Sequence, residues 1–370
     1  QWLLWDRHRN DWQLLPLQSE SGRPLSLGDF GDISGFGLWD TSGRQFSPDG
    51  RWLALGGNDG QISLFDLQST DPSSSLRRWK AHNGAASPIL FAGDSGRLIT
   101  ASAGDDCIVW DLSTPQLPRT VVTLPNGCQK IATDADGRYV AICDGSNLHL
   151  WDIASTKKPV HKLSLRLNTS DTISRHDIAF SSNGRFLAAS DDDATIWLWD
   201  FEQASPEKSA VMLGQHNDGV IGLRFTPDDQ RLISWSTDGT ARIYFTATTR
   251  RELVLRGHEA AIYSVAISPS GLSLATGGND HTIRVWNLAS PDPNDNAFVL
   301  RGHDAAISSL AFSPDGDVLY SSSWDDSIRS WALQQSLASR RRIHVSEEQL
   351  FGGGFLARSA TSENGFLVAK

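Results

Sequence analysis

The sequence predicts an all-β protein built from a repeated unit. One unit is stated twice, as GHEAAIYSVAISPSGLSLATGGNDHTIRVWNL from Gly257 and as GHDAAISSLAFSPDGDVLYSSSWDDSIRSWAL from Gly302. Short apolar runs alternate in it with clusters of Gly, Pro, Asp and Asn, which is the pattern of strands joined by tight turns. The sequence contains no sustained apolar stripe of helical period, so the predicted class is all-β.

Seven copies of the unit are legible when each is anchored on the aromatic residue that ends its third apolar run. A turn such as SPDG or SSNG precedes each anchor. Self-similarity at a fixed period indicates an array in which each unit packs on its neighbours. The anchors recur every 41 to 48 residues, at Phe65, Trp110, Trp151, Trp199, Tyr244, Trp286 and Trp331.

The GH and WD residues that begin and end these copies resemble the WD40 repeat family, and the resemblance covers nearly the whole chain. WD40 repeats form a β-propeller, whose blades of four antiparallel strands surround a central channel. The resemblance therefore implies a single propeller domain over residues 1–370. The closely similar neighbouring copies also resemble those of bacterial multidomain WD-repeat proteins.

The two ends of the chain do not coincide with a repeat boundary. The front end has the pattern of the third and fourth strands of a blade, and the back end that of a first and a second strand. We expect residues 1–18 and 354–370 to form an eighth blade together, which would leave no open sheet edge. The alternative is seven blades with an N-terminal closing strand. The fourth strand of the last complete repeat is expected at 341–345.

In the WD40 family a His, a Ser or Thr, an Asp and a Trp form a hydrogen-bonded set within one blade. Its periodic recurrence favours a structural role, since a catalytic triad would be needed only once. The fifth copy keeps the His, Ser and Asp but carries Tyr244 at the Trp position. The resemblance implies complete sets in the sixth and seventh copies, formed by His258, Thr276, Asp280 and Trp286, and by His303, Ser321, Asp325 and Trp331.

The resemblance also implies a partner-binding surface on the loops around the channel mouth. Trp324 stands out there, because a large aromatic residue in a turn has no core role that the repeat requires, and aromatic residues are enriched among interface hot spots. Trp235 and Tyr263 are further candidates, although either could pack between blades. The residues that directly precede the repeat Asp project to this surface in the family and are here Asn58, Asp192, Thr237, Asn279 and Trp324.

Composition narrows the function classes. The net charge of −10 argues against a general nucleic-acid footprint, and no run approaches the 18 apolar residues of a membrane span. Cys107, Cys128 and Cys143 lack CxxC spacing, which indicates a reduced, cytoplasmic chain. The oxygen-rich segment at Asp292 lacks the Gly and Glu of a calcium loop, so we expect no metal and no cofactor.

We therefore expect a non-enzymatic scaffold or sensor module that binds a protein or peptide and is part of a larger protein. Two alternatives remain open. A propeller enzyme would need His, Asp and Glu side chains facing the channel, and His176 and Asp177 are the nearest candidates. A purely structural array within an assembly would instead use its edges for attachment.

Overall fold

The regular structure of the protein is formed by β-strands. α-Helix is absent from the part of the chain that the computed structural model describes, and short 3-10 turns lie at η2 (Pro72–Ser75) and η4 (Pro293–Asn296). The all-β class is therefore confirmed. The described residues are 2–6, 11–15, 43–69, 72–93, 95–102, 105–114, 118–124, 128, 130–144, 147–153, 160–166, 177–203, 209–247, 252–333, 347–352, 355–358 and 366–369.

Seven sheets each contain four consecutive strands, and every strand pairs antiparallel with the next one along the chain. Sheet 1 contains β3 (Arg44–Phe46), β4 (Trp52–Gly56), β5 (Gln61–Asp66) and β6 (Arg77–Lys80). Sheet 2 contains β7 (Ile89–Ala92), β8 (Arg97–Thr100), β9 (Cys107–Asp111) and β10 (Arg119–Leu124). Sheet 3 contains β11 (Lys130–Thr133), β12 (Tyr139–Cys143), β13 (Asn147–Asp152) and β14 (Val160–Arg166).

The second half of the chain continues this order. Sheet 4 contains β15 (Ile178–Phe180), β16 (Phe186–Ser190), β17 (Thr195–Asp200) and β18 (Val211–Gln215). Sheet 5 contains β19 (Val220–Phe225), β20 (Arg231–Ser236), β21 (Ala241–Phe245) and β22 (Glu252–Leu255). Sheet 6 contains β23 (Ile262–Ile267), β24 (Ser273–Gly278), β25 (Ile283–Asn287) and β26 (Phe298–Leu300). Sheet 7 contains β27 (Ile307–Phe312), β28 (Val318–Ser323), β29 (Ser327–Ala332) and β30 (Glu347–Gly352).

The SPDG-type turns explain why the first two strands of each sheet form a hairpin. In the turn at Ser313, the Ser313 Oγ accepts the N–H of Val318 at 2.9 Å. Gly316 has φ +80°, a left-handed conformation that glycine adopts without strain. In sheet 5 Asp229 takes the glycine position with φ +55°, and its carboxylate accepts the N–H of Ser182 in the corresponding turn of sheet 4 at 2.7 Å. This turn therefore also joins two sheets.

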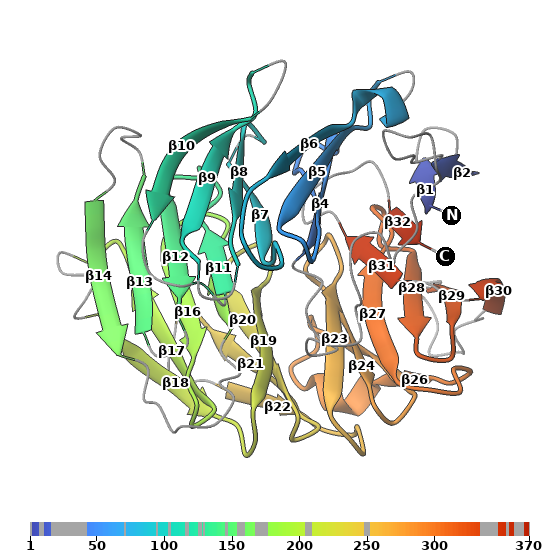
Figure 1. Ribbon diagram of the computed structural model, residues 1–370. Coiled ribbons are helices and arrows are strands. Elements are labelled where there is room, and N and C mark those ends of the chain that lie inside the picture. Colours follow the sequence, from blue (N-terminus) through green and yellow to red (C-terminus); the bar gives the residue numbers. More distant parts are fainter. Residues whose placement is uncertain are drawn as a thin grey trace.

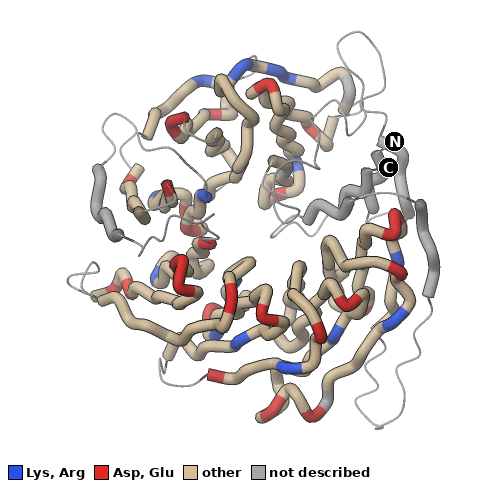
Figure 2. Tube along the Cα trace, turned by 60° about the horizontal axis from the view of Figure 1, so that its bottom comes forward, with Lys and Arg blue, Asp and Glu red and all other residues tan. Residues whose placement is uncertain are grey.

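The sheets are arranged in a ring, with their first strands innermost (Figures 1 and 2). First strands of neighbouring sheets contact each other, as β11 does with β15 and β23 with β27. Apolar side chains fill the space between sheets. One buried cluster joins Ile283 of sheet 6 to Ile307, Leu310 and Trp331 of sheet 7. The architecture is that of a β-propeller.

One further four-stranded sheet, the terminal sheet, combines both ends of the chain in the order β2-β1-β32-β31. It contains β1 (Trp2–Asp6), β2 (Asp11–Leu15), β31 (Phe355–Arg358) and β32 (Phe366–Ala369). In its register Leu3 lies opposite Val368, and the two ends of the chain lie close together in Figure 1. β31 contacts β27 of sheet 7 and β3 of sheet 1. The count of eight blades stays a proposal.

The fourth strand of the last complete repeat differs from the expectation. Residues 341–345 lie outside the described residues, and the strand that pairs with β29 is β30, at Glu347–Gly352. The connection that precedes it is therefore longer than the sequence pattern indicates. Connections of this kind tolerate insertions, so repeat spacing defines strand positions poorly after them.

Candidate functional site: the channel-mouth face

Two kinds of connection share one face of the ring. Because neighbouring strands are antiparallel, the end of a second strand and the start of a third lie at the same end of the sheet as the start of the first and the end of the fourth. The turns between second and third strands therefore lie beside the loops that link successive sheets. We call this side the channel-mouth face. The SPDG-type turns lie on the opposite face.

His258, in the loop before β23, links three parts of sheet 6. Its Nδ1 lies 2.9 Å from Oδ2 of Asp280 in the β24–β25 turn, and its Nε2 lies 2.8 Å from Oγ1 of Thr276 on β24. The same Oγ1 accepts the indole N–H of Trp286 at 2.9 Å. The His258 side chain and Trp286 are buried. The set therefore fixes the loop to the strands while giving its buried polar groups partners.

Sheet 7 repeats this arrangement. His303 Nδ1 lies 2.8 Å from Asp325 Oδ2, and Nε2 lies 2.7 Å from Ser321 Oγ, which accepts the Trp331 indole N–H at 2.8 Å. Burial lowers the pKa of His303, although Asp325 opposes the shift. Burial acts to raise the pKa of Asp325, but hydrogen bonds, led by that from Ser327, hold it well below its usual range. Asp325 is therefore ionised at neutral pH.

Sheet 5 keeps the His, Ser and Asp of the set with a tyrosine in place of the tryptophan. His216 Nδ1 lies 3.0 Å from Asp238 Oδ2, and its Nε2 lies 2.6 Å from Ser234 Oγ. Tyr244 occupies the Trp position, and burial raises the pKa of its hydroxyl. The His-centred contacts therefore form without the indole.

Sheet 2 contains a comparable set, centred on His82. His82 Nε2 lies 2.8 Å from Thr100 Oγ1, and the Trp110 indole N–H donates to the same oxygen at 2.8 Å. Asp105 accepts the backbone N–H of Asn83 at 3.0 Å, as the corresponding carboxylates do in sheets 5 to 7. Thr100 lies ten residues before Trp110, the spacing found in the sixth and seventh copies, and this signal could have identified it.

Sheets 3 and 4 lack the loop His at this spacing, and a ring N–H of the third strand contacts the turn carboxylate instead. In sheet 4 the Trp197 indole N–H donates to Asp191 Oδ2 at 2.8 Å. In sheet 3 His149 Nε2 lies 3.0 Å from Asp144 Oδ2. A short turn is thus stabilised from within the sheet rather than from the preceding loop.

The candidate surface residues that precede the repeat Asp all lie in turns of the channel-mouth face. In sheets 5 to 7 the backbone N–H groups of Thr237, Asn279 and Trp324 each donate to a carbonyl of the preceding loop, at 2.8 to 3.0 Å. Asn279 is exposed, and Thr237 and Trp324 are half-buried. Asn58 in sheet 1 is exposed, and Asp192 in sheet 4 is half-buried.

Tyr263 and Trp324 lie together across the boundary between sheets 6 and 7. Their ring centroids are 5.4 Å apart and their planes are inclined by 36°. The β23–β24 pairing shifts register between Ile262 and Ser264, so Tyr263 lies in a β-bulge, a feature that redirects a side chain at the end of a strand. Both aromatic residues are half-buried. We call this pair the Tyr263–Trp324 patch.

Trp235 does not belong to this surface, so its candidacy as a surface residue was wrong. Its side chain is 8% exposed and packs in a cluster with Ile262 and Leu274 of sheet 6. Gly222 pairs with it in the register of sheet 5, and a Cβ at Gly222 would lie 2.1 Å from the Trp235 ring. The missing side chain at Gly222 leaves the space that the indole fills.

The other candidates for a site are His176 and Asp177, the acidic groups and the cysteines. His176 lies outside the described residues, and Asp177 accepts the N–H of Leu223 at 2.8 Å across sheets 4 and 5. In the described part of the chain no group of three or more His, Cys, Asp or Glu could hold a metal ion. Cys107, Cys128 and Cys143 are buried.

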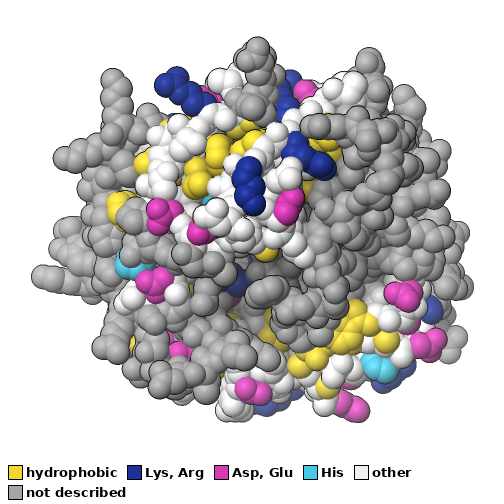
Figure 3. All heavy atoms as spheres, in the orientation of Figure 1, with side chains coloured by type: hydrophobic (Ala, Val, Ile, Leu, Met, Phe, Trp, Pro, Cys, Tyr) yellow, Lys and Arg dark blue, Asp and Glu magenta, His cyan; other side chains and the backbone are white. Residues whose placement is uncertain are grey.

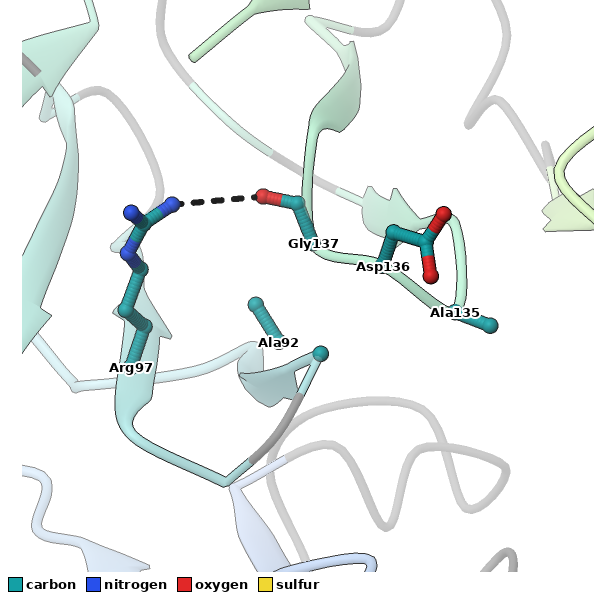
Figure 4. A pocket seen from close by; sticks show the side chains of 6 residues that line it. Ala92, Arg97, Ala135, Asp136 and Gly137 are labelled. Carbon is teal, nitrogen blue, oxygen red and sulfur yellow. Dashed lines mark hydrogen bonds between the residues drawn. The ribbon is translucent and has the colours of Figure 1, made fainter. Parts of the chain in front are cut away.

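A hollow on the opposite face lies between the turns of sheets 2 and 3 (Figure 4). Arg97 donates from Nη1 to the carbonyl of Gly137 at 3.5 Å. The carboxylate of Asp136 points away from Arg97 in this view. Small residues, Ala92, Gly93 and Ala135, form the remaining walls, so little side-chain chemistry converges there.

Charge is unevenly distributed over the surface. Lys and Arg side chains gather in the upper part of Figure 3, near β6 with its sequence RRWK. Asp and Glu residues recur along sheets 4 to 7, with fewer Lys and Arg residues between them, in the lower half of Figure 2. The Tyr263–Trp324 patch lies in this second, acidic part. In the described part of the chain no helix has the length and apolar character needed to cross a bilayer.

Comparison with known proteins identifies the repeats. The family model described as "WD domain, G-beta repeat" matches residues 35–66, 159–200, 207–244, 250–287 and 295–332. Autophagy-related protein 16 of Arabidopsis thaliana is 26% identical over 223 residues, which cover 60% of this chain and 42% of that protein. A guanine nucleotide-binding protein subunit beta of Oryza sativa subsp. japonica is 28% identical over 257 residues, covering 65% of this chain and 56% of the relative. The periodic tryptophan protein 2 homolog of Dictyostelium discoideum is 23% identical over 274 residues, covering 66% of this chain and 28% of the relative.

Proposed function

Because the chain belongs to the WD-repeat family of β-propellers, we propose that it is a non-catalytic scaffold or sensor module that binds a protein or peptide through its channel-mouth face. One relative is named as a subunit, a protein that works in an assembly with other chains. The three cysteines, an odd number without CxxC spacing, support a reducing, cytoplasmic setting. In this proposal the chain acts as one module of a larger protein.

The observation that carries the proposal is the Tyr263–Trp324 patch. The turn backbones beside it are fixed to the preceding loops by hydrogen bonds, and the His303 set fixes the loop of sheet 7. A rigid turn presents its side chains at little further entropic cost on binding. Aromatic residues on such a frame are typical anchors of protein interfaces. Asn279 extends the same surface with an exposed amide.

The test is an affinity capture from a lysate of the source cells, with captured proteins identified by mass spectrometry and re-tested as purified proteins. The wild-type chain is compared with a Trp324→Ala, Asn279→Ala double variant whose fold is verified by circular dichroism. Phe298→Ala is the matched control, because Phe298 is an exposed aromatic residue on the outer strand β26.

The proposal predicts a partner that is retained by the wild type and the Phe298→Ala control but lost by the double variant. Equal capture by all three chains would place the interaction elsewhere and contradict the proposal. Loss in the Phe298→Ala control alone would favour a structural array that attaches through its outer edge.

A further inference from the structure

Carboxylates surround the turn that carries Trp324. Asp325 and Asp326 follow it directly, and the backbone N–H of Asp304, in the preceding loop, donates to Asp325 Oδ2 at 3.0 Å. This hydrogen bond brings Asp304 beside the turn. Asp304 and Asp326 are exposed, so their charges face solvent next to the aromatic patch.

The neighbouring histidine does not neutralise this group. Burial lowers the pKa of His303, which leaves the imidazole uncharged at neutral pH while its partner Asp325 is ionised. Among the residues that the structure describes, Arg329 is the cation that lies beside this set, with its Nε 3.5 Å from Ser327 Oγ. Three carboxylates and one guanidinium leave the surroundings of Trp324 negative.

Sheet 6 provides a further acidic group in the loop that leads into β23, the strand that carries Tyr263. The N–H of Glu259 donates to Asp280 Oδ2 at 3.1 Å, and the Glu259 side chain is exposed. Exposed cations on this face, Arg256 and Arg301, lie where the outer strands end and the loops begin. Arg284 donates to the carbonyl of Gly257 at 2.6 Å. Arg256 and Arg301 therefore lie at the outer ends of these loops, whereas Asp304, Asp325 and Asp326 lie at the turn that carries Trp324.

We propose that the Tyr263–Trp324 patch receives an Arg or Lys side chain from a basic peptide segment of the partner protein. A cation is attracted to the face of an aromatic ring within about 6 Å of its centroid, and Trp gives the strongest attraction. The surrounding carboxylates supply charge complementarity, which raises the association rate and disfavours acidic segments. This inference rests on the proposed function, since it specifies the partner for the same face.

The inference is tested with three fluorescein-labelled peptides in which four Arg, four Gln or four Glu residues alternate with Gly. Binding to the purified chain is measured by fluorescence anisotropy at low and raised salt. We expect only the Arg peptide to bind, with an affinity that decreases as salt increases. Trp324→Ala is expected to weaken it about fivefold or more, since central aromatic contacts dominate interfaces.

Asp304→Lys reverses one of the surface charges and is expected to weaken Arg-peptide binding. The loss of affinity relative to the wild type should grow as salt is lowered. Its matched control is Asp317→Lys, which makes the same charge change in an exposed turn on the opposite face of sheet 7 and should leave binding unchanged. Thermal melts of each variant establish that the fold is retained. Absence of Arg-peptide binding, binding of the Glu peptide, or equal affinity in Trp324→Ala and the wild type would each overturn the inference.

The same variants separate this inference from the proposed function. A captured partner that is lost in the Trp324→Ala, Asn279→Ala variant but retained by Asp304→Lys, and at raised salt, would leave the proposed function in place and overturn the basic-segment inference. Capture that is indifferent to the double variant would contradict the proposed function itself.

Discussion

His303 Nδ1 lies 2.8 Å from Asp325 Oδ2, and the two residues come from different loops of sheet 7. Burial lowers the pKa of the imidazole. Burial acts to raise the pKa of the Asp325 carboxyl, but the hydrogen bonds that this carboxyl accepts keep its pKa low. At neutral pH the fold therefore contains a neutral His beside a charged Asp, and this combination links stability to pH.

Stability is expected to fall between pH 7 and pH 5. His82 and His303 both have pKa values lowered by burial, whereas His in an unfolded chain titrates near about 6.5. The unfolded chain therefore binds protons first, so stability present above about pH 6.5 is lost as pH falls through the lower folded values. Urea unfolding at pH 7, 6 and 5 measures this. Ser182→Ala, at an exposed turn residue that does not titrate, is the control that should keep the same pH slope. Constant or rising stability toward pH 5 would refute the account.

Removal of the Ser321 hydroxyl, which contacts both His303 and Trp331, should destabilise the protein, although only one oxygen atom is lost. Ser321→Ala leaves the indole N–H of Trp331 and Nε2 of His303 buried without their partner. The expected cost is about 1–3 kcal/mol in the free energy of unfolding. Ser182→Ala, at an exposed turn residue, is the control and should change it by less than about 0.5 kcal/mol. Equal effects of both substitutions would show that the set is not stabilising.

Gly222 and Trp235 should be energetically coupled. Gly222→Ala places a Cβ 2.1 Å from the indole, so we expect overpacking that costs about 1–3 kcal/mol. In a Trp235→Ala background the same substitution should cost much less, because the obstructing ring is gone. A double-mutant cycle by urea unfolding gives the coupling energy. Additive effects within about 0.5 kcal/mol would be inconsistent with the observed contact.

The eight-blade proposal predicts that the two ends of the chain can be joined covalently. Leu3 and Val368 are paired across β1 and β32, and directly opposed antiparallel residues lie at Cα separations that a disulfide can span. Leu3→Cys with Val368→Cys should therefore cross-link under mild oxidation. Leu3→Cys with Ala357→Cys is the control, because β31 is one strand further away. Under the seven-blade alternative, in which β32 does not pair with β1, the first pair would fail to cross-link.

The sequence was most informative where contacts stay within one repeat. His303, Ser321 and Trp331 are at fixed separations in the chain, and those separations are repeated in other copies, so their proximity could be predicted. Contacts between sheets carry no such signal. The burial of Trp235 depends on Gly222 and on sheet 6, and the proximity of Tyr263 to Trp324 depends on a bulge.

Long connections limited the prediction in a second way. The repeat pattern indicated a strand at 341–345, whereas the strand begins at Glu347. In sheets 3 and 4 the turn carboxylate is contacted by His149 and Trp197, which both lie two residues before the anchor, a position that is not part of the His-centred sets. Substitutes of this kind become visible only when the side chains are placed in space.

The most direct test of the central claim is hydrogen–deuterium exchange of the chain with and without its purified partner. If the channel-mouth face binds, protection should appear in residues 258–263 and 323–326, which include the Tyr263–Trp324 patch. The opposite turns at 268–272 and 313–317 should exchange at unchanged rates. Protection confined to those opposite turns or to the outer strand β26, with none around Trp324, would contradict the account.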